Sequence, residues 1–294
     1  MRPLELYIHI PFCVKKCKYC DFLSGPSTAD QRETYVTSLC QDIRAYADLA
    51  KAYRVISIFV GGGTPSILTA EQMERIFEAV RETFYVEKDA EITVEMNPGT
   101  VDADKLSGYK RCGINRLSIG LQSTKNRELQ ILGRIHTYEE FVETYQLART
   151  EGFENINIDL MSAIPGQRLV DWEESLRVVA KLGPEHISAY SLIVEEGTPF
   201  YEEYGEGRHA EELPDEETER KMYWRTKEIL KEYGYMRYEI SNYAKPGYEC
   251  RHNIGYWERT EYLGIGTGAA SLINNSRFNY GEEPEKLTVS AQME

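Results

Sequence analysis

Strand-like and helix-like stretches alternate along the first two thirds of the chain, and this alternation limits the folds that it can adopt. The first five predicted strands are each followed by one or two segments with helical periodicity. Such alternation produces a parallel sheet with right-handed crossovers. We therefore expect an α/β fold, a (β/α)6 partial barrel. The predicted strands span 4–10, 55–60, 90–96, 116–121, 155–161 and 186–192, and the predicted helices span 31–51, 70–84, 102–110, 125–132, 138–150 and 170–182, with Asp30 and Thr69 as N-caps of the first two.

Three of the six cysteines lie at the exit of the first predicted strand. Cys13, Cys17 and Cys20 have C-x3-C-x2-C spacing, and Pro11 ends the strand before them because proline has no N–H for a sheet ladder. A tetrahedral structural zinc site needs four ligands. An iron–sulfur cube can be held by three thiolates while its fourth iron stays open. The spacing therefore favours an iron–sulfur cluster.

Two other interpretations of these cysteines are weaker. A zinc site would need Cys40 or His9 as its fourth ligand. A disulfide framework is expected in an oxidising compartment, yet the N-terminus has no basic-then-apolar signal. No run of about 18 apolar residues could span a bilayer. We therefore expect a cytoplasmic protein with reduced cysteines.

The charge balance also excludes some partners. Asp and Glu number 48 against 34 Lys and Arg, so the formal net charge is −14. Such acidity argues against general binding of nucleic acid or of anionic membranes. The most acidic stretch, 195–219, contains several Gly and Pro residues and is predicted to be a solvated connection, not a site. A helix over 216–233 and a strand over 235–240 are predicted after it.

Polar and glycine residues fall where the predicted strands end. In parallel barrels, functional groups gather at the carboxyl ends of the strands. Gly61 to Pro65 follow the second strand, Glu95 ends the third, Gln122 follows the fourth, and Asp159 lies near the end of the fifth. Together with the cysteines after strand one, they predict one site at this edge of the sheet.

The stretch YIHIPFCVKKCKYCDF, from Tyr7 to Phe22, resembles the radical S-adenosylmethionine (SAM) superfamily. The sequence on both sides of the three cysteines is similar to the anaerobic coproporphyrinogen III oxidase-like family and, within that family, to the heme chaperone branch, HemW. The similarity extends over nearly the whole chain. It implies a radical SAM partial barrel with a 4Fe–4S cluster on Cys13, Cys17 and Cys20, and SAM bound at the open iron.

The resemblance also implies a set of SAM contacts, because five further sequence segments match the family: GGGTPS, VEMNP, SIGLQS, LGRIHT and INIDLM. Glycines let the backbone approach a ligand without a Cβ. An arginine suits the SAM carboxylate, and Gln and Asp side chains suit ribose hydroxyls. The implied contacts are Tyr7, Tyr19, Gly62, Gly63, Thr64, Glu95, Gln122, Arg134 and Asp159.

A second motif, HNIGYW, spans 252–257. An imidazole can ligate heme iron axially, although a lone His beside Tyr and Trp is more often a packing residue. The motif is similar to the heme-binding motif of the HemW branch, and this similarity implies that His252 is the iron ligand. Cys250 is an alternative thiolate ligand.

Two functions follow from the resemblance. The first is a heme chaperone that transfers heme to recipient hemoproteins such as respiratory-chain enzymes, with a homodimer as one assembly to consider. The alternative is an oxygen-independent coproporphyrinogen III dehydrogenase, which forms protoporphyrinogen IX by SAM-dependent oxidative decarboxylation. Phe22 replaces a Cys of the decarboxylases, Cys13 lies close to the N-terminus, and HNIGYW is present. These features favour the carrier over the enzyme.

The predicted organisation has two parts. Residues 1–194 are expected to form the radical SAM partial barrel with the 4Fe–4S and SAM site. Residues 195–294 are expected to form the acidic connection and a short C-terminal α+β extension that carries HNIGYW. Relatives commonly continue into a helical C-terminal domain, which we expect this chain to lack.

Overall fold

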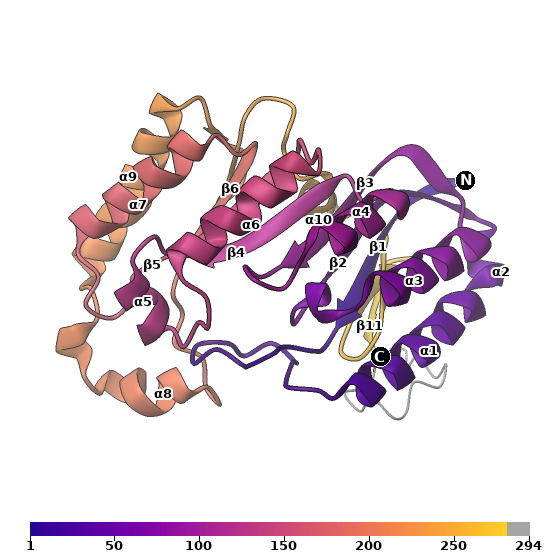
Figure 1. The fold of residues 1–294 in the computed structure, drawn as a ribbon, viewed down its shortest axis with the longest axis horizontal. Helices are drawn as coiled ribbons and strands as arrows, with labels where there is room; N and C mark the ends of the chain where they lie inside the picture. Colours follow the sequence, from indigo (N-terminus) through magenta and orange to yellow (C-terminus); the bar gives the residue numbers. More distant parts are fainter. Residues whose placement is uncertain (281–294) are drawn as a thin grey trace.

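One mixed sheet organises residues 1–280, which are the residues that the computed structural model describes (Figure 1). Its strands are β1 Arg2–Ile10, β2 Tyr53–Gly62, β3 Val86–Met96, β4 Arg116–Gln122, β5 Ile156–Ser162, β6 His186–Ser191, β7 Met236–Arg237, β8 Asn242–Ala244, β9 Tyr262–Ile265, β10 Ala270–Ile273 and β11 Ser276–Asn279. The helices are α1 Ala29–Ala45, α2 Ala47–Ala50, α3 Ala70–Thr83, α4 Ala103–Arg111, α5 Asn126–Ile131, α6 Tyr138–Thr150, α7 Leu169–Leu182, α8 Pro199–Tyr204, α9 Glu216–Glu232 and α10 Arg251–Glu258.

The strand order within the described residues is β11-β10-β9-β1-β2-β3-β4-β5-β6-β8-β7. Strands β1 to β6 pair in parallel in chain order, as the alternation predicted. The sheet does not close into a barrel, because β1 and β6 do not pair with each other. Strand β9 pairs in parallel with the edge of β1 that faces away from β2, and β8 pairs antiparallel with β6. This open α/β sheet is compatible with the expected partial barrel.

Local capping signals explain where the helices begin. Thr69 caps α3 with a capping box to Gln72, as predicted, because its hydroxyl accepts the Gln72 N–H. The first helix differs: it begins after Thr28, not Asp30, because Thr28 forms the same box with Gln31. The predicted single helix over 31–51 is also wrong, since α1 ends at Ala45 and α2 follows it. The predicted strand over 235–240 is reduced to β7.

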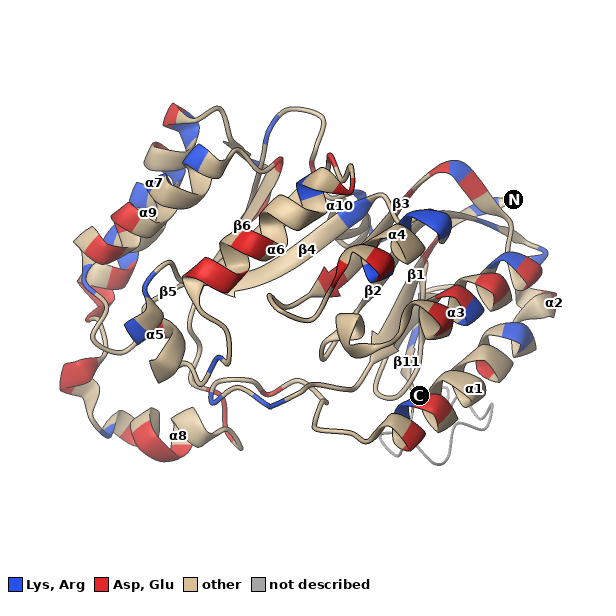
Figure 2. Ribbon diagram, viewed as in Figure 1, with Lys and Arg blue, Asp and Glu red and all other residues tan. Residues whose placement is uncertain are grey.

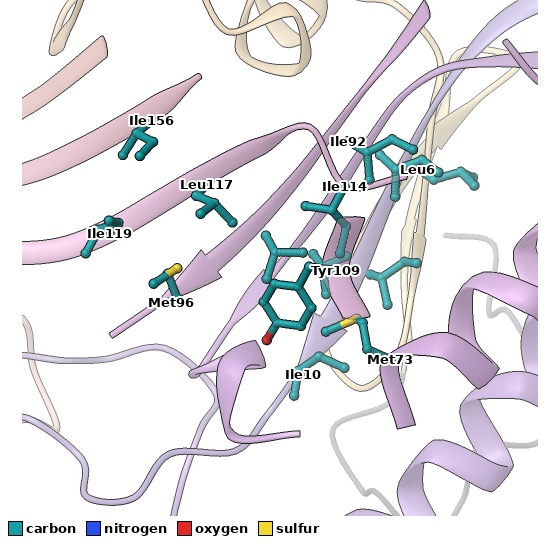
Figure 3. Packing of buried hydrophobic residues seen from close by; sticks show 14 of the residues in the cluster. Leu6, Ile10, Met73, Ile92, Met96, Tyr109, Ile114, Leu117, Ile119 and Ile156 are labelled. Atoms are coloured by element: carbon teal, nitrogen blue, oxygen red, sulfur yellow. The ribbon is translucent and has the colours of Figure 1, made fainter. Parts of the chain in front are cut away.

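The main core lies between the sheet and the helices that cover its outer face. Alternate residues of β1, including Leu6 and Ile10, are fully buried there. Figure 3 shows Met73 of α3 and Tyr109 of α4 gathered near Ile10. The other face of β1 carries Glu5, Tyr7 and His9, because side chains alternate between the two faces of a strand. Polar groups therefore line the inner face of the sheet, opposite the face that the outer helices cover.

The acidic stretch 195–219 is folded, which corrects the prediction that it is only a solvated connection. It contains α8 and two short 3-10 helices, Gly205–Gly207 and Ala210–Glu212. Phe200 is fully buried in a small second core with Leu132 and Tyr204, against which Tyr19 packs. Figure 2 shows basic positions in the loop after β1 near the acidic α8, and Lys18 Nζ lies 3.8 Å from Glu203.

Residues after 194 add strands to both edges of the same sheet. Strand β9 extends it beyond β1, and β8 and β7 extend it beyond β6. Helix α9 packs on α7, where Trp172 Nε1 donates to Thr226 Oγ1 at 2.9 Å. The boundary predicted at residue 194 therefore falls within one continuous sheet, and residues 281–294 of the predicted second part lie outside the described residues.

No helix within residues 1–280 has both the length and the apolar character that crossing a membrane requires.

Candidate functional site

A cavity of about 420 Å³ lies at the carboxyl ends of the parallel strands. Its wall contains most of the residues singled out from the sequence, and these come from the loop after β1, from the ends of β2 to β5 and, for Arg134, from the turn between α5 and α6. They are Cys13, Cys17, Tyr19, Cys20, Gly62, Gly63, Thr64, Glu95, Gln122, Arg134 and Asp159. The structure therefore brings the predicted cysteines and eight of the nine predicted SAM contacts around one space.

Backbone hydrogen bonds hold the cysteine loop over this cavity. Cys13 N donates to Gly25 O at 2.9 Å, and Lys18 N donates to Leu132 O at 3.1 Å. Phe200 N in turn donates to Lys18 O at 3.0 Å. All three cysteines of the loop are free thiols and half-buried. The loop is thus fixed by the segments after β4 and β6 and presents its sulfurs to the cavity.

The thiols do not converge as a single zinc ion requires. Zn–S bonds of about 2.3 Å in a tetrahedron place the sulfurs about 3.8 Å apart. Within residues 1–280, the only group of three or more potential ligands that lie within 4.8 Å of one another is His209, Glu211 and Glu212. Cys40, an alternative fourth ligand, lies in the main core. The open spacing of the loop thiols fits a larger polynuclear group.

His9, the other alternative zinc ligand, has a structural role. Its Nε2 lies 3.0 Å from Leu23 O, and its Nδ1 lies 3.0 Å from the Tyr7 hydroxyl. The ring therefore ties the end of the cysteine loop to β1. Tyr7 does not line the cavity, because its hydroxyl points to His9 and its ring stacks near Phe59.

The glycines after β2 allow the cysteine loop to approach the sheet closely. Gly62 has φ +109°, and a Cβ there would lie 2.5 Å from His9 Cε1. A Cβ on Gly63 would lie 2.6 Å from Phe12 O. Gly63 N and the next amide donate to Ile10 O and Phe12 O. In this structure the absent Cβ atoms make room for the chain's own loop.

Two acidic side chains lie on the floor of the cavity. Glu95 Oε2 accepts from Gly62 N at 3.1 Å, and burial together with nearby Asp159 raises the pKa of Glu95 to about 8. Asp159 Oδ1 accepts from Asn157 Nδ2 at 2.7 Å, and burial also raises the pKa of Asp159. A cationic ligand beside these carboxyl groups would favour their ionised forms.

Arg134 is the main cation of the site. Its Nη2 donates to Asn97 Oδ1 at 2.7 Å and to Gly120 O at 2.6 Å, and its Nη1 lies 3.7 Å from Cys17 Sγ. Its buried Nε has no partner among residues 1–280. An unpaired buried donor is costly, so the guanidinium is suited to an anionic group in the cavity.

Gln122 has a strained backbone at the end of β4. Its φ is +72°, and the pairing of β4 with β5 shifts register between Gly120 and Gln122. Residues other than glycine rarely adopt a positive φ, and such strain concentrates at functional sites. The Tyr190 hydroxyl donates to Gln122 Oε1 at 2.8 Å, so the amide is fixed at the cavity wall.

Several cavity residues were not predicted from the sequence. Asn97 directly follows the predicted third strand and occurs within the segment VEMNP, and Tyr190 lies within the predicted sixth strand, but neither was assigned a role. Lys15, Ile193 and Glu195 also line the cavity. Asn97 lies at the same kind of strand end as Glu95 and Gln122, so its position is the signal that could have identified it.

His252 lies apart from this cavity, on the inner face of the sheet. Its ring packs against that of Phe59, with the two ring centroids 5.3 Å apart. It is 1% exposed. Its Nδ1 lies 2.9 Å from Ser57 Oγ, and its Nε2 lies 3.1 Å from the Tyr256 hydroxyl. Burial, aided by Arg116, lowers the pKa of His252 to about 3. The ring is therefore neutral at pH 7, and both of its nitrogens have partners.

Cys250, the alternative heme ligand, is also enclosed. It is fully buried, and its Sγ donates to Glu91 Oε1 at 3.3 Å. Burial raises the pKa of this thiol to about 12. The thiolate that would ligate iron is thus disfavoured in this conformation.

Comparisons with known proteins agree on the family. The Radical SAM superfamily model matches residues 7–179. The heme chaperone HemW of Escherichia coli (strain K12) is 42% identical over 92% of this chain and 70% of its own length. HemW of Bacillus subtilis (strain 168) is 38% identical over 92% of this chain and 71% of its own length.

A solved structure is similar over almost the whole chain. Coproporphyrinogen III oxidase (HemN) from Escherichia coli, described as a radical SAM enzyme, matches with a TM-score of 0.83 and 28% identity. The match covers 97% of this chain and 68% of HemN. The open sheet, the loop with three cysteines and the sequence similarity lead to one conclusion: the chain belongs to the radical SAM superfamily and, within it, to the HemW family of heme chaperones.

Proposed function

We propose that the chain is a heme chaperone that carries a 4Fe–4S cluster and SAM in the cavity at the strand ends. Cys13, Cys17 and Cys20 would ligate the cluster. The observation that carries this proposal is the assembly of these thiols, Arg134 and the strand-end polar residues around one cavity. A cluster with bound SAM supplies one-electron reducing chemistry.

The surrounding residues suit the separate parts of SAM. Arg134 offers a cation to its carboxylate. Glu95 and Asp159 offer carboxyl oxygens to its amino group and ribose hydroxyls, and Gln122 offers a fixed amide. Tyr19 offers an aromatic face. Together these groups bind and orient the ligand, and the cysteine loop shields one side of it from water.

We further propose that heme binds through His252 on α10, the helix that contains HNIGYW. The support is the membership of the HemW family and the motif itself. The neutral imidazole has the protonation state that a heme ligand needs. Since both nitrogens have partners in this structure, ligation requires α10 or its neighbours to move. Residues 1–194 would then supply the cofactor site, and the residues after 194 would supply the heme site.

The proposed partners of the heme-loaded protein are recipient hemoproteins, with respiratory-chain enzymes as first candidates by resemblance, and a homodimer is the assembly to test. We place this exchange in the cytoplasm, since all six cysteines are free thiols, as a reducing compartment favours.

Hemin titration tests the heme proposal. The protein is expected to give a Soret band that His252→Ala weakens strongly. His209→Ala is the matched control, because His209 is the exposed histidine of the described residues and the obvious place for adventitious hemin. A band that survives His252→Ala but disappears in His209→Ala would remove His252 as the ligand.

The likeness to HemN makes decarboxylation the second function to test. The reconstituted protein is incubated anaerobically with SAM, dithionite and coproporphyrinogen III, and deoxyadenosine and tetrapyrrole products are measured together. We expect coproporphyrinogen III to remain unconverted. Formation of protoporphyrinogen IX would replace the carrier proposal with the enzymatic one.

A further inference from the structure

We propose that Asn97 is a positioning residue that directs the Thr64 hydroxyl onto the sulfur of Cys13 and thereby makes the cluster easier to reduce. This inference rests on the proposed 4Fe–4S cluster. None of the sequence patterns assigned a role to Asn97, which follows β3 and lines the cavity.

Three hydrogen bonds connect the cation of the site to a cluster ligand. Arg134 Nη2 donates to Asn97 Oδ1 at 2.7 Å. Asn97 Nδ2 donates to Thr64 Oγ1 at 2.9 Å. Thr64 Oγ1 donates to Cys13 Sγ at 3.4 Å. The chain therefore runs from the guanidinium through an amide and a hydroxyl to the thiol.

The direction of the hydrogen bonds follows from the chemistry of the groups. A guanidinium has donors only, so the Asn97 atom that faces Arg134 must be the amide oxygen. The amide nitrogen then faces Thr64 and occupies a lone pair of its hydroxyl. The hydroxyl hydrogen is left for an acceptor, and Cys13 Sγ lies within reach. Arg134 thus fixes the orientation of Asn97, and Asn97 fixes that of Thr64.

The backbone holds these groups in place. Thr64 is 2% exposed, and its N–H donates to Phe12 O at 2.6 Å, beside Cys13. Asn97 O accepts from the Thr100 hydroxyl at 2.6 Å. Gly120 leaves space for the arrangement, because a Cβ there would lie 2.9 Å from Asn97 Oδ1. The three hydrogen bonds therefore belong to a rigid wall.

A hydrogen bond to a ligand sulfur stabilises the more negative, reduced state of a cluster more than the oxidised state, and such bonds help to set cluster potentials. Arg134 Nη1 also lies 3.7 Å from Cys17 Sγ. The same network therefore reaches two of the three sulfurs. Loss of the hydroxyl donor should make reduction less favourable.

The test is a redox titration of the anaerobically reconstituted protein without SAM, followed by EPR of the reduced cluster. We expect Thr64→Val to lower the equilibrium constant for reduction about tenfold, which is about 59 mV for a one-electron couple. Thr64→Ser retains a hydroxyl and should restore most of the potential. Thr226→Val removes a buried hydroxyl on α9, outside the cavity and the three bonds, and should leave the potential unchanged.

A double-mutant cycle tests whether Asn97 acts through Thr64. Asn97→Ala should lower the potential in the wild-type background and have little effect in the Thr64→Val background. Equal effects in both backgrounds would overturn the positioning role. If Thr64→Val does not assemble the cluster, the comparison of Asn97→Ala with Thr226→Val decides, and equal potentials reject the inference. A wild-type protein that takes up no cluster would instead refute the proposed function.

Discussion

The inner face of the sheet carries polar groups at both ends of its strands, but the two ends are organised in opposite ways. At the carboxyl ends, thiols, carboxyl groups and Arg134 line a cavity. Toward the other ends, Ser57 of β2 and Glu91 of β3 bond to α10 and its N-cap, and Glu5 of β1 lies beneath Gly255 of the same helix. There Glu91 accepts from Cys250 Sγ and from the N–H groups of Arg251 and His252 at 3.2–3.3 Å.

The difference separates a cavity that is ready for a ligand from a proposed heme site that must open. The cavity offers about 420 Å³ of open space and a strained residue, Gln122, at its wall. Helix α10 instead has a carboxylate at its N-terminus, where the helix dipole favours negative charge, and its His252 is bonded on both nitrogens. We infer that the proposed cofactors enter a prepared site, whereas heme bound at His252, as proposed, has to displace internal bonds.

The largest expected effect is at the cavity. Cys17→Ser should abolish assembly of the 4Fe–4S cluster, because two remaining thiolates and a weak hydroxyl ligand cannot replace the third thiolate. Iron and sulfide content and the charge-transfer absorbance after anaerobic reconstitution measure this loss. Cys112→Ser is the matched control, since Cys112 lies in the main core. The hemin Soret band of Cys17→Ser should be unaffected. A full cluster in this variant would contradict the ligand set.

The next prediction concerns pH and the enclosed end. Glu5 is fully buried, and burial raises its pKa to about 8, with Glu91 and Glu258 adding to the shift. A raised pKa means that the folded state favours the protonated acid. The stability contributed by neutral Glu5 is complete below pH 4.5, its ordinary pKa, and is lost as pH rises through 8.

We therefore expect Glu5→Gln to stabilise the protein at pH 9 relative to wild type, by several kcal/mol, since each pKa unit corresponds to about 1.4 kcal/mol. At pH 5 the variant should have nearly wild-type stability or less. Urea unfolding of the apo protein at both pH values measures the difference. Glu154→Gln, at an exposed position before β5 that does not contribute to the shift of Glu5, is the control. Equal pH dependence in Glu5→Gln and wild type would show that Glu5 is not the titrating group.

Much of the fold follows from local signals. Apolar runs and caps such as Thr69 and Asp102 lie within the segments that they define, so strands β1 to β6 and most helices were predicted correctly. The pairing of β9 with β1 joins segments more than 250 residues apart, and no local pattern encodes it. Thr28 and Asp30 are both good capping residues, and only the reciprocal bond with Gln31 decides between them.

The candidate site, like the fold, was predictable where local patterns define it and not where it depends on contacts between distant segments. Cysteine spacing and the rule of strand ends identified the three thiols, the glycine turn after β2 and the polar groups Glu95, Gln122 and Asp159 of the cavity wall, whereas Tyr19 and Arg134 came only from the family resemblance. The role of Phe200 could not be recognised within an acidic run, although this ring is buried in the second core and packs beside Tyr19. The environment of His252 could not be predicted, because its partner Ser57 lies almost 200 residues away.

Close packing between α10 and β1 gives the next prediction. A Cβ on Gly255 would lie 2.1 Å from Glu5 Oε1, so Gly255→Ala should force α10 outward and cost about 1–3 kcal/mol of unfolding free energy. The cluster content should not change. Gly25→Ala is the control, because a Cβ there has no neighbour within 4 Å among the described residues. Loss of the cluster in Gly255→Ala would show that the two ends are coupled.

The prediction with the smallest expected effect tests whether the α10 end opens when heme binds to His252. The Ser57 hydroxyl donates to Glu5 Oε1 at 3.2 Å, so His252 Nδ1 is the donor to Ser57 and Nε2 accepts from the Tyr256 hydroxyl. Nε2 is then the nitrogen that a heme iron would take. Because one such hydrogen bond contributes about 0.5–1.5 kcal/mol, Tyr256→Phe should tighten hemin binding by about twofold to tenfold.

Hemin titrations at pH 7 measure this change, with Tyr262→Phe as the control. The Tyr262 ring packs edge-on against that of Tyr256, with centroids 4.7 Å apart, and makes no hydrogen bond to His252 within residues 1–280. Tighter binding in Tyr256→Phe alone would mean that the hydroxyl holds the ligand closed. Weaker binding would mean that Tyr256 contacts the bound heme, and the enclosed end would then be a partly prepared site, closer in kind to the cavity at the opposite ends of the strands.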